Sequence, residues 1–214
     1  MPPKKRTGQK LLRFDRSLDA RLVAGADEAG RGPLAGPLVV AGVLLDYQCL
    51  RDHRVRPLAL LNDSKQVDAA TRDELYRAVI ACAERVSVRV FPAFVIDRDG
   101  LHRCNLRGLR EVLWACQPAD ASLVDGFKLG PLAPPHRAVV DGDTKSAAIA
   151  AASIVAKVTR DRYMRTADAL YPGYGFASHV GYITPSHTKV VRERGPCEIH
   201  RRSWRSRAYD PAPV

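Results

Sequence analysis

Apolar residues near the start of the chain occur in two short runs. Residues 22–26 form the first run, which stops at Asp27, and residues 38–45 form the second. Each run has the length and composition of a buried strand. Between them lies a short segment rich in Gly and Pro (EAGRGPLAGP), so we predict two strands joined as an antiparallel pair.

The rest of the chain changes repeatedly between patterns typical of strands and of helices. Strands are predicted at residues 86–90, 121–125 and 137–141, and helices at residues 71–84, 101–113, 146–170 and 184–194. Thr71 and Glu74 have the spacing of a capping box for the first of these helices. Loops are predicted at residues 46–63 and 171–182, and a loose basic tail at residues 1–20. This mixture predicts an α/β fold with one sheet and helices on its faces.

The composition suits a globular protein, and the net charge predicts a negatively charged binding partner. The 214 residues are 46% hydrophobic and 27% charged, which suits one globular domain, with or without a small appendage. With 34 Lys and Arg against 23 Asp and Glu, the formal net charge is +11 and the sequence pI is about 9.8. This balance favours a polyanionic partner such as nucleic acid, although a solvated basic surface also accounts for it.

The cysteines and histidines argue against two common kinds of site. The five Cys include no Cys-x-x-Cys pair and the six His no His-x₃₋₅-His spacing, so we expect neither a zinc site nor a disulfide framework. Unpaired cysteines fit a reducing cytosol. The first residues lack the apolar run of a signal peptide, and no apolar stretch reaches the ~18–20 residues of a membrane span. We expect a soluble, cytoplasmic protein.

Acidic residues follow three of the predicted strands: Asp27 with Glu28, Asp125, and Asp141 with Asp143. A carboxylate at the end of an apolar strand leaves the sheet at its edge, where ligands bind in open α/β folds. Clustered carboxylates repel one another and raise each other's pKa unless a cation neutralises them. Because Mg²⁺ and Mn²⁺ prefer oxygen ligands, the pattern favours a divalent-metal site.

Some of these acids also have an ordinary structural interpretation. Asp143 precedes the predicted helix at residues 146–170, where a negative charge suits the helix dipole as a cap. Asp125 precedes a glycine, which is typical of a turn. The pair of Asp27 and Glu28 lacks such a routine role. The candidate site therefore consists of Asp27, Glu28, Asp125 and Asp143, without Asp141.

Gly30-Arg31-Gly32 directly follows the first acid pair. Glycines let a backbone approach a ligand closely, and exposed backbone N–H groups donate to phosphate or hydroxyl oxygens. The spacing matches neither the dinucleotide-binding fingerprint nor the phosphate-binding loop of nucleotide hydrolases, and a lone Gly-x-Gly is more often a turn. Beside Asp27 and Glu28, it becomes a candidate substrate-binding loop.

These residues together resemble a known family. Residues 27–33 (DEAGRGP) are similar to the hallmark motif of the type 2 ribonucleases H. Further matches follow in the family's order: Asp63-Ser64-Lys65, the Val-Asp-Gly around Asp125, Gly142-Asp143, the run AAASIVAKVTRD ending at Asp161, a segment at Tyr174, and Gly181-Tyr182. The resemblance covers roughly residues 22–203, and its first and longest motifs together are highly specific.

The resemblance implies an RNase H-like fold, with a mixed five-stranded sheet flanked by helices and a C-terminal helical extension. We divide the chain accordingly into a basic N-terminal tail at residues 1–20, a catalytic domain at residues 21–170, and a substrate-binding extension and tail at residues 171–214. The implied activity is that of an endoribonuclease that cuts the RNA strand of RNA/DNA hybrids. It also implies incision on the 5′ side of single ribonucleotides embedded in duplex DNA, leaving 5′-phosphate and 3′-hydroxyl ends.

The resemblance implies roles for individual residues too. Asp27, Glu28, Asp125 and Asp143 correspond to catalytic acids that hold two Mn²⁺ or Mg²⁺ ions. The backbone of Gly30, Arg31 and Gly32 corresponds to the loop that reads the ribose 2′-hydroxyl, Tyr182 to a residue that packs on the neighbouring sugar, and Lys65 to a phosphate contact. Two positions depart from the family: Val180 replaces the usual Lys, and Ile183 the usual Gly or Pro.

Two rival functions are weighed against this interpretation. A non-catalytic hybrid-binding protein is disfavoured by acids at all four matched positions. A phosphotransferase on a related fold would need a nucleotide-phosphate loop, which the sequence lacks. We expect a monomer whose partners are RNA/DNA hybrids and ribonucleotide-containing duplex DNA, with no membrane association.

Overall fold

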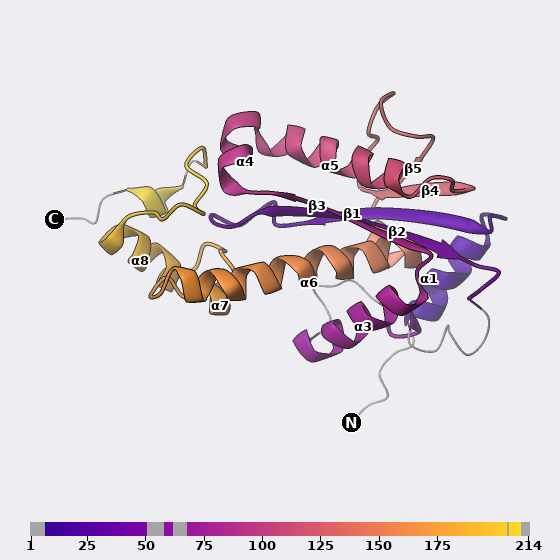
Figure 1. The fold of residues 1–214 in the computed structure, drawn as a ribbon, viewed down its shortest axis with the longest axis horizontal. Helices are drawn as coiled ribbons and strands as arrows, with labels where there is room; N and C mark the ends of the chain where they lie inside the picture. Colours follow the sequence, from indigo (N-terminus) through magenta and orange to yellow (C-terminus); the bar gives the residue numbers. More distant parts are fainter. Residues whose placement is uncertain (1–6, 51–57, 62–67, 205, 211–214) are drawn as a thin grey trace.

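A single mixed sheet forms the centre of the molecule (Figure 1). The structure, a computed structural model, describes residues 7–50, 58–61, 68–204 and 206–210. The strands are β1 Leu22–Ala29, β2 Leu38–Asp46, β3 Arg85–Phe91, β4 Ala121–Asp125 and β5 Arg137–Val139, in the order β3-β2-β1-β4-β5. β1 pairs with β2 and β2 with β3 in antiparallel fashion, whereas β1 with β4 and β4 with β5 are parallel. The predicted mixed five-stranded sheet is confirmed.

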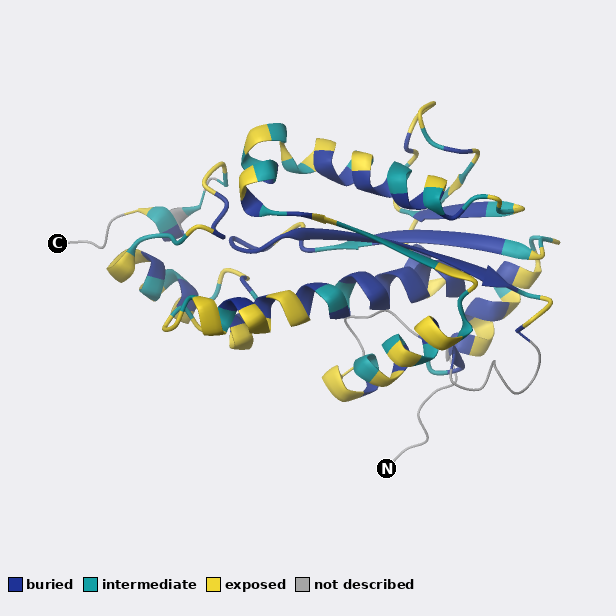
Figure 2. Cartoon of the chain, in the orientation of Figure 1, coloured by how far each residue is buried: buried dark blue, intermediate teal, exposed yellow. Residues whose placement is uncertain are grey.

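Helices cover both faces of the sheet. The helices α1 Thr7–Arg16, α3 Ala69–Cys82 and α6 Ala147–Leu170 lie on one face, and α4 Ala93–Asp99 and α5 Leu101–Ala115 on the other (Figure 1). Successive side chains of β2 alternate between the two cores, with Val39 and Val43 in the first and Val40 and Leu44 in the second. Because both faces are covered, every residue of β2 is buried, as Figure 2 shows, and its sequence is an unbroken apolar run up to the final Asp46.

The longest helix, α6, packs directly on β1. Its first turns are rich in Ala, and the residue of β1 that faces them is Gly25. A Cβ atom at Gly25 would overlap the main chain of Ala148, so the contact requires glycine on the strand and small residues on the helix. The same close contact brings Ser153 of α6 within hydrogen-bonding reach of Asp27 at the end of β1.

The prediction of a loose tail over residues 1–20 is wrong for α1. Leu11 and Leu12 are buried in the core, and Asp15 is fully buried. The Asp15 carboxylate accepts hydrogen bonds from the Tyr47 hydroxyl at 2.7 Å and the Ala148 backbone N–H at 2.9 Å. It thus lies at the N-terminus of α6, where the helix dipole favours a negative charge. Only one side of α1 faces the core, so polar and basic residues dominate its sequence.

Two predicted element boundaries are also wrong. α3 begins at Ala69 and is capped by Asp68, whose carboxylate accepts from the Thr71 backbone N–H at 2.9 Å, so Thr71 is not the cap. β5 ends at Val139 because Asp141 adopts a left-handed conformation (φ 51°) that cannot continue a strand. Part of the predicted loop at residues 46–63 lies outside the described residues.

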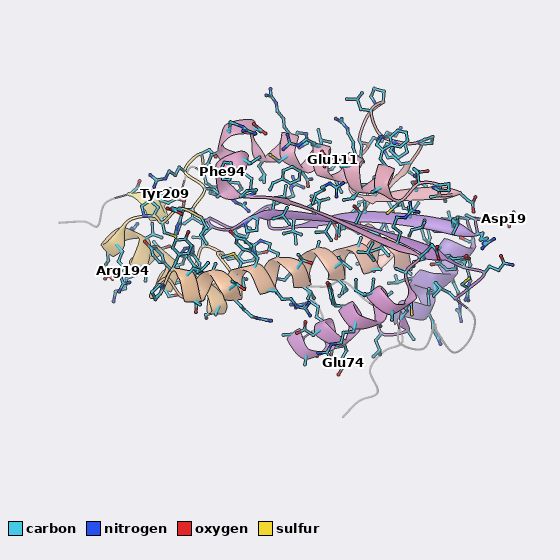
Figure 3. The ribbon with its side chains drawn as sticks, in the orientation of Figure 1. Asp19, Glu74, Phe94, Glu111, Arg194 and Tyr209 are labelled. Atoms are coloured by element: carbon cyan, nitrogen blue, oxygen red, sulfur yellow. The ribbon has the colours of Figure 1, made fainter. Side chains whose placement is uncertain are left out.

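The C-terminal segment forms a helical extension at the far end of α6. It contains α7 Phe176–His179, α8 Pro185–Arg194 and a 3₁₀ turn at Arg207–Tyr209. Thr184 caps α8 as predicted and accepts from the His187 backbone N–H at 3.1 Å, whereas α7 lies where a loop was predicted. Figure 3 labels Arg194 and Tyr209 in this extension, and Asp19 at the opposite end of the molecule. Within the described ranges, no helix combines the length and apolarity needed to cross a membrane.

Replacing Leu12 with Ala should lower the free energy of unfolding by roughly 2–5 kcal/mol, because the surrounding core collapses only partly around the cavity. The Leu12 side chain is 1% exposed. Arg13→Ala, on the exposed side of the same helix, is the matched control and should change the free energy by less than about 0.5 kcal/mol. Denaturant titration measures both, and equal small effects would show that α1 adds nothing to the core.

Candidate active site

Strand pairing brings acids from two distant segments together. β1 and β4 are parallel, with Ala26 beside Val124, so Asp27 and Asp125 lie at the same end of neighbouring strands. The pKa of Asp27 lies well above its ordinary value, first because the carboxyl is buried and then because Glu28 and Asp125 repel its charge. Three of the four predicted acids therefore share one electrostatic site.

Asp143 reaches the same region from the 3₁₀ turn Gly142–Thr144 that precedes α6. The Gly142 backbone N–H donates to Asp125 Oδ1 at 2.7 Å, which ties this turn to the end of β4. The structure rejects the cap interpretation of Asp143, because the N-cap of α6 is Ser146, whose hydroxyl accepts from the Ile149 backbone N–H. Asp143 is buried beside the site without capping the helix.

Hydrogen bonds orient the two acids of β1 differently. Asp27 is 6% exposed and accepts from the Glu28 backbone N–H at 2.7 Å and from Ser153. Glu28 forms an ion pair with Arg31 at 3.2 Å. Burial raises the pKa of Glu28, and the nearby Arg31 guanidinium and the Asn105 amide oppose that rise.

Asn105, on α5, is the unusual neighbour of this site. It is completely buried, and although its amide lies close enough to influence Glu28, the contact does not meet hydrogen-bond geometry. Both polar atoms of its side chain therefore lack a hydrogen-bond partner among the described residues. A buried amide in this position costs free energy unless another group, such as a bound ion's hydration shell, completes its bonding.

The predicted substrate-binding residues also meet in space. Gly30 has a φ of 97°, and Gly32 lies so close to Tyr182 that a Cβ atom built on it would be 3.7 Å from the Tyr182 ring. The Tyr182 side chain is 43% exposed, so its ring is accessible beside the loop. Lys65, the remaining predicted contact, lies outside the described residues.

A sequence model of the family described as Ribonuclease HII matches residues 24–207. The chain belongs to the ribonuclease HII family. Curated ribonucleases HII from Nocardia farcinica and Rhodococcus opacus are similar to it, at 49% identity over 86% of this chain and 72% of the relative, and at 46% identity over 85% and 79%. Membership makes this chain a metal-dependent type 2 ribonuclease H that hydrolyses the RNA strand of RNA/DNA hybrids.

Solved structures agree with the fold. Ribonuclease H2 from Pyrococcus horikoshii has a TM-score of 0.71 at 26% identity, covering 88% of this chain and 95% of that one. Ribonuclease HII from Archaeoglobus fulgidus, solved in complex with PCNA, has a TM-score of 0.66 at 27% identity, covering 87% and 96%. A Bst-RNase HIII in complex with Mn²⁺ matches at a TM-score of 0.61 and 20% identity, over 90% of this chain and 67% of that one, which shows the shared fold.

The donor chemistry of this ribonuclease HII site fits a hard divalent cation. Within the described ranges, no three His, Cys, Asp or Glu side chains are already arranged as metal ligands. The acids nevertheless offer only oxygen donors, share a buried region, and carry a repulsion that raises the pKa of Asp27. A cation of the Mg²⁺ type removes that repulsion with the oxygen ligands it prefers.

Sequence reasoning missed the buried polar residues that surround this ribonuclease HII site. Asn105, Arg160 and Arg201 are each at most 1% exposed. Arg160 lies within the matched motif of α6, but nothing in the motif shows that its side chain points inward. Arg201 lies among other arginines in the predicted substrate-binding extension, and only the tertiary contacts distinguish it from them.

Asp27→Asn should raise the melting temperature of the metal-free enzyme at neutral pH. Because the pKa of Asp27 is raised on folding, the folded state binds the proton more tightly, and stability falls as pH rises above the ordinary value of 3.8. A tenfold difference in proton affinity between the folded and unfolded states corresponds to about 1.4 kcal/mol. At this chain length, ~1 kcal/mol moves the melting temperature by about 2–4 °C.

Asp141→Asn, at an exposed residue just before the turn that carries Asp143, is the control and should leave the melting temperature unchanged. Below pH 3.8 the gain from Asp27→Asn should vanish, and added Mg²⁺ should stabilise the wild type more than the variant. A variant less stable than wild type at neutral pH would contradict the repulsion described above.

Proposed function

We propose that this ribonuclease HII incises duplex DNA on the 5′ side of a single embedded ribonucleotide, in addition to cutting long RNA/DNA hybrids. The observation that carries the proposal is the closeness of Gly32 to the Tyr182 ring, which places a backbone able to read a 2′-hydroxyl beside an exposed aromatic surface. The 2′-hydroxyl is the group that distinguishes RNA from DNA at a given site. A loop that reads it beside the acids needs only one ribonucleotide.

The proposed chemistry is phosphodiester hydrolysis giving 5′-phosphate and 3′-hydroxyl ends. Asp27, Glu28, Asp125 and Asp143 would hold two Mn²⁺ or Mg²⁺ ions, which when bound supply an activated water and stabilise the leaving 3′-oxygen. Ser153 and the Glu28 backbone N–H orient the Asp27 carboxylate. Gly142 likewise orients Asp125 through its backbone N–H. These contacts hold the acids in place before substrate binds, which reduces the reorganisation needed during reaction.

Residues 171–214 supply the proposed surface for the DNA beyond the ribonucleotide. A groove of about 560 Å³ adjoins the Tyr182 loop and is lined by Ile183, Thr184, Pro185, Thr188, Lys189, Arg192 and Glu193. Basic side chains there suit phosphates, which position a duplex without reading its sequence. The net charge of +11 supports the same non-specific attraction. Ile183, which departs from the family, is 51% exposed at this groove.

Asp27→Asn and Asp143→Asn should each reduce cleavage of a hybrid by more than the roughly 100-fold that loss of an outer-shell metal partner costs. Binding of the hybrid should survive, because the phosphates are held elsewhere. Cleavage rates with Mg²⁺ and with Mn²⁺ measure activity, gel shifts measure hybrid binding, and thermal melting measures the stability of the fold. Asp141→Asn is the control, and near-normal turnover of either test variant would remove that residue from the site.

Wild type should cut duplexes with one or many ribonucleotides and leave all-DNA duplex intact. Tyr182→Ala should slow the single-ribonucleotide substrate by about 10- to 100-fold, because loss of an aromatic stacking contact costs ~1–3 kcal/mol. The long hybrid should lose less, because most of its cut sites have no junction with DNA. Tyr182→Phe retains the ring and should behave like wild type.

End-labelled duplexes with zero, one or many ribonucleotides measure these rates. Equal losses on the single-ribonucleotide and long-hybrid substrates would exclude Tyr182 from junction recognition. A wild type that ignores the single ribonucleotide would restrict the enzyme to long hybrids.

A further inference from the structure

Two completely buried arginines lie beneath the loops of the proposed recognition surface. Arg160 comes from α6 and Arg201 from the C-terminal extension, and they are 1% and 0% exposed. We infer that Arg201 and Arg160 are positioning residues that hold the Gly30–Gly32 backbone and the Tyr182 loop in the geometry that reads the ribonucleotide. This inference rests on the proposed function of those two loops.

Arg201 binds the backbone of the glycine loop directly. Its guanidinium donates to the carbonyl oxygens of Gly30 at 2.6 Å, Arg31 at 3.3 Å and Gly36 at 3.0 Å. In a trans peptide the C=O and the following N–H point in opposite directions. Carbonyls of Gly30 and Arg31 that face the buried guanidinium therefore turn the N–H groups of Arg31 and Gly32 away from it.

Those two N–H groups are the ones a 2′-hydroxyl or phosphate oxygen would need. Throughout the described part of the chain, neither the Arg31 nor the Gly32 N–H takes part in a hydrogen bond within the protein. The Arg31 and Gly32 donors are thus left available, while the Gly30 and Arg31 acceptors are both engaged by the Arg201 side chain. A neutral or single-donor residue at position 201 could not reach three carbonyls, because only Arg presents a rigid fork of five N–H groups.

Arg160 connects the same loop to Tyr182. Its guanidinium donates to Ala35 at 3.0 Å and Pro37 at 3.0 Å on one side, and to Val180 at 2.9 Å on the other. The guanidinium carbon lies 5.8 Å from the centre of the Tyr182 ring. Val180 needs this support, because a β-branched residue with a φ of 42° is strained. Its departure from the family leaves the contact intact, since Arg160 binds the carbonyl and not the side chain.

Burial of two arginines without an ion pair costs free energy of folding, which argues that they have a role beyond stability. Among the described residues, no carboxylate forms an ion pair with Arg160 or Arg201. Burial, and secondarily the charge of Arg160, lowers the pKa of Arg201 to about 9. Two buried cations near one another destabilise a fold unless they gain a compensating anion.

Arg201→Lys and Arg160→Lys test the inference, because Lys keeps the charge and loses the planar fork. Arg110→Lys is the matched control, since Arg110 also donates to a backbone carbonyl, that of Leu129 at 2.9 Å, but on α5. With a long hybrid as substrate, kcat should fall by about 10-fold or more in the two test variants. KM, which the surface phosphate contacts set, should stay near the wild-type value. The control should match wild type in both constants.

Hydrogen exchange in the metal-free enzyme provides a readout that is independent of cleavage. The backbone amides of Leu34, Ala35 and Gly36 are bonded to Gly181 and Ile199 across the two loops. Their exchange should become faster in Arg201→Lys and Arg160→Lys and remain unchanged in Arg110→Lys. If wild type failed to cut the single-ribonucleotide duplex, the proposed function would be wrong, while exchange would still decide whether the arginines order the loops.

Chemical rescue separates positioning from simple stability. Free guanidinium ion should restore part of the lost kcat of Arg201→Ala and none of the activity of Asp27→Asn. If Arg201→Ala does not fold, the kcat of the Lys variants and their hydrogen exchange decide whether the two arginines position the loops. The inference is overturned if the Lys variants keep the wild-type kcat and exchange pattern, or if their loss of activity equals the fraction of unfolded enzyme.

Discussion

Because β1 and β4 run parallel with Ala26 beside Val124, Asp27 and Asp125 leave the sheet at the same edge. The close packing of α6 on Gly25 then buries Asp27, and the turn before α6 is tied to Asp125 through Gly142. Like charges held together out of water raise the pKa of Asp27, and a divalent cation relieves that cost. The proposed metal site would thus follow from the packing of the central strands.

The proposed recognition surface, which consists of the Gly30–Gly32 loop and Tyr182, is assembled from distant parts of the chain. Hydrogen bonds from the Leu34 and Ala35 backbone to Gly181 join the glycine loop to the segment that carries Tyr182. His187 supports that segment from behind by a ring hydrogen bond to the Tyr182 carbonyl at 2.8 Å, and itself contacts His200 at 3.1 Å. Burial lowers the pKa of both histidines to about 4, so this support stays uncharged at neutral pH.

Buried charge connects the two halves of the site. Burial and the repulsion of neighbouring acids raise the pKa of Asp27 and so disfavour its charge, and burial also lowers the pKa of Arg160 and Arg201. Each arrangement reduces the stability of the free enzyme. A divalent cation at the acids, as proposed, would relieve the first of these costs.

The sequence by itself determined the central strands, α6, and the acids at the strand ends, because periodicity and short motifs report local conformation. It left α1 unrecognised, since two leucines in a basic segment are a weak helical signal and the helix depends on packing in the core. It also left open whether Asp143 caps α6, because the answer depends on Ser146 occupying that position. Only the tertiary structure decided that Gly32 lies near Tyr182 and that Arg160 and Arg201 are buried. Burial of a polar side chain and proximity between loops depend on which distant segments pack together out of water. The local sequence pattern does not determine that packing.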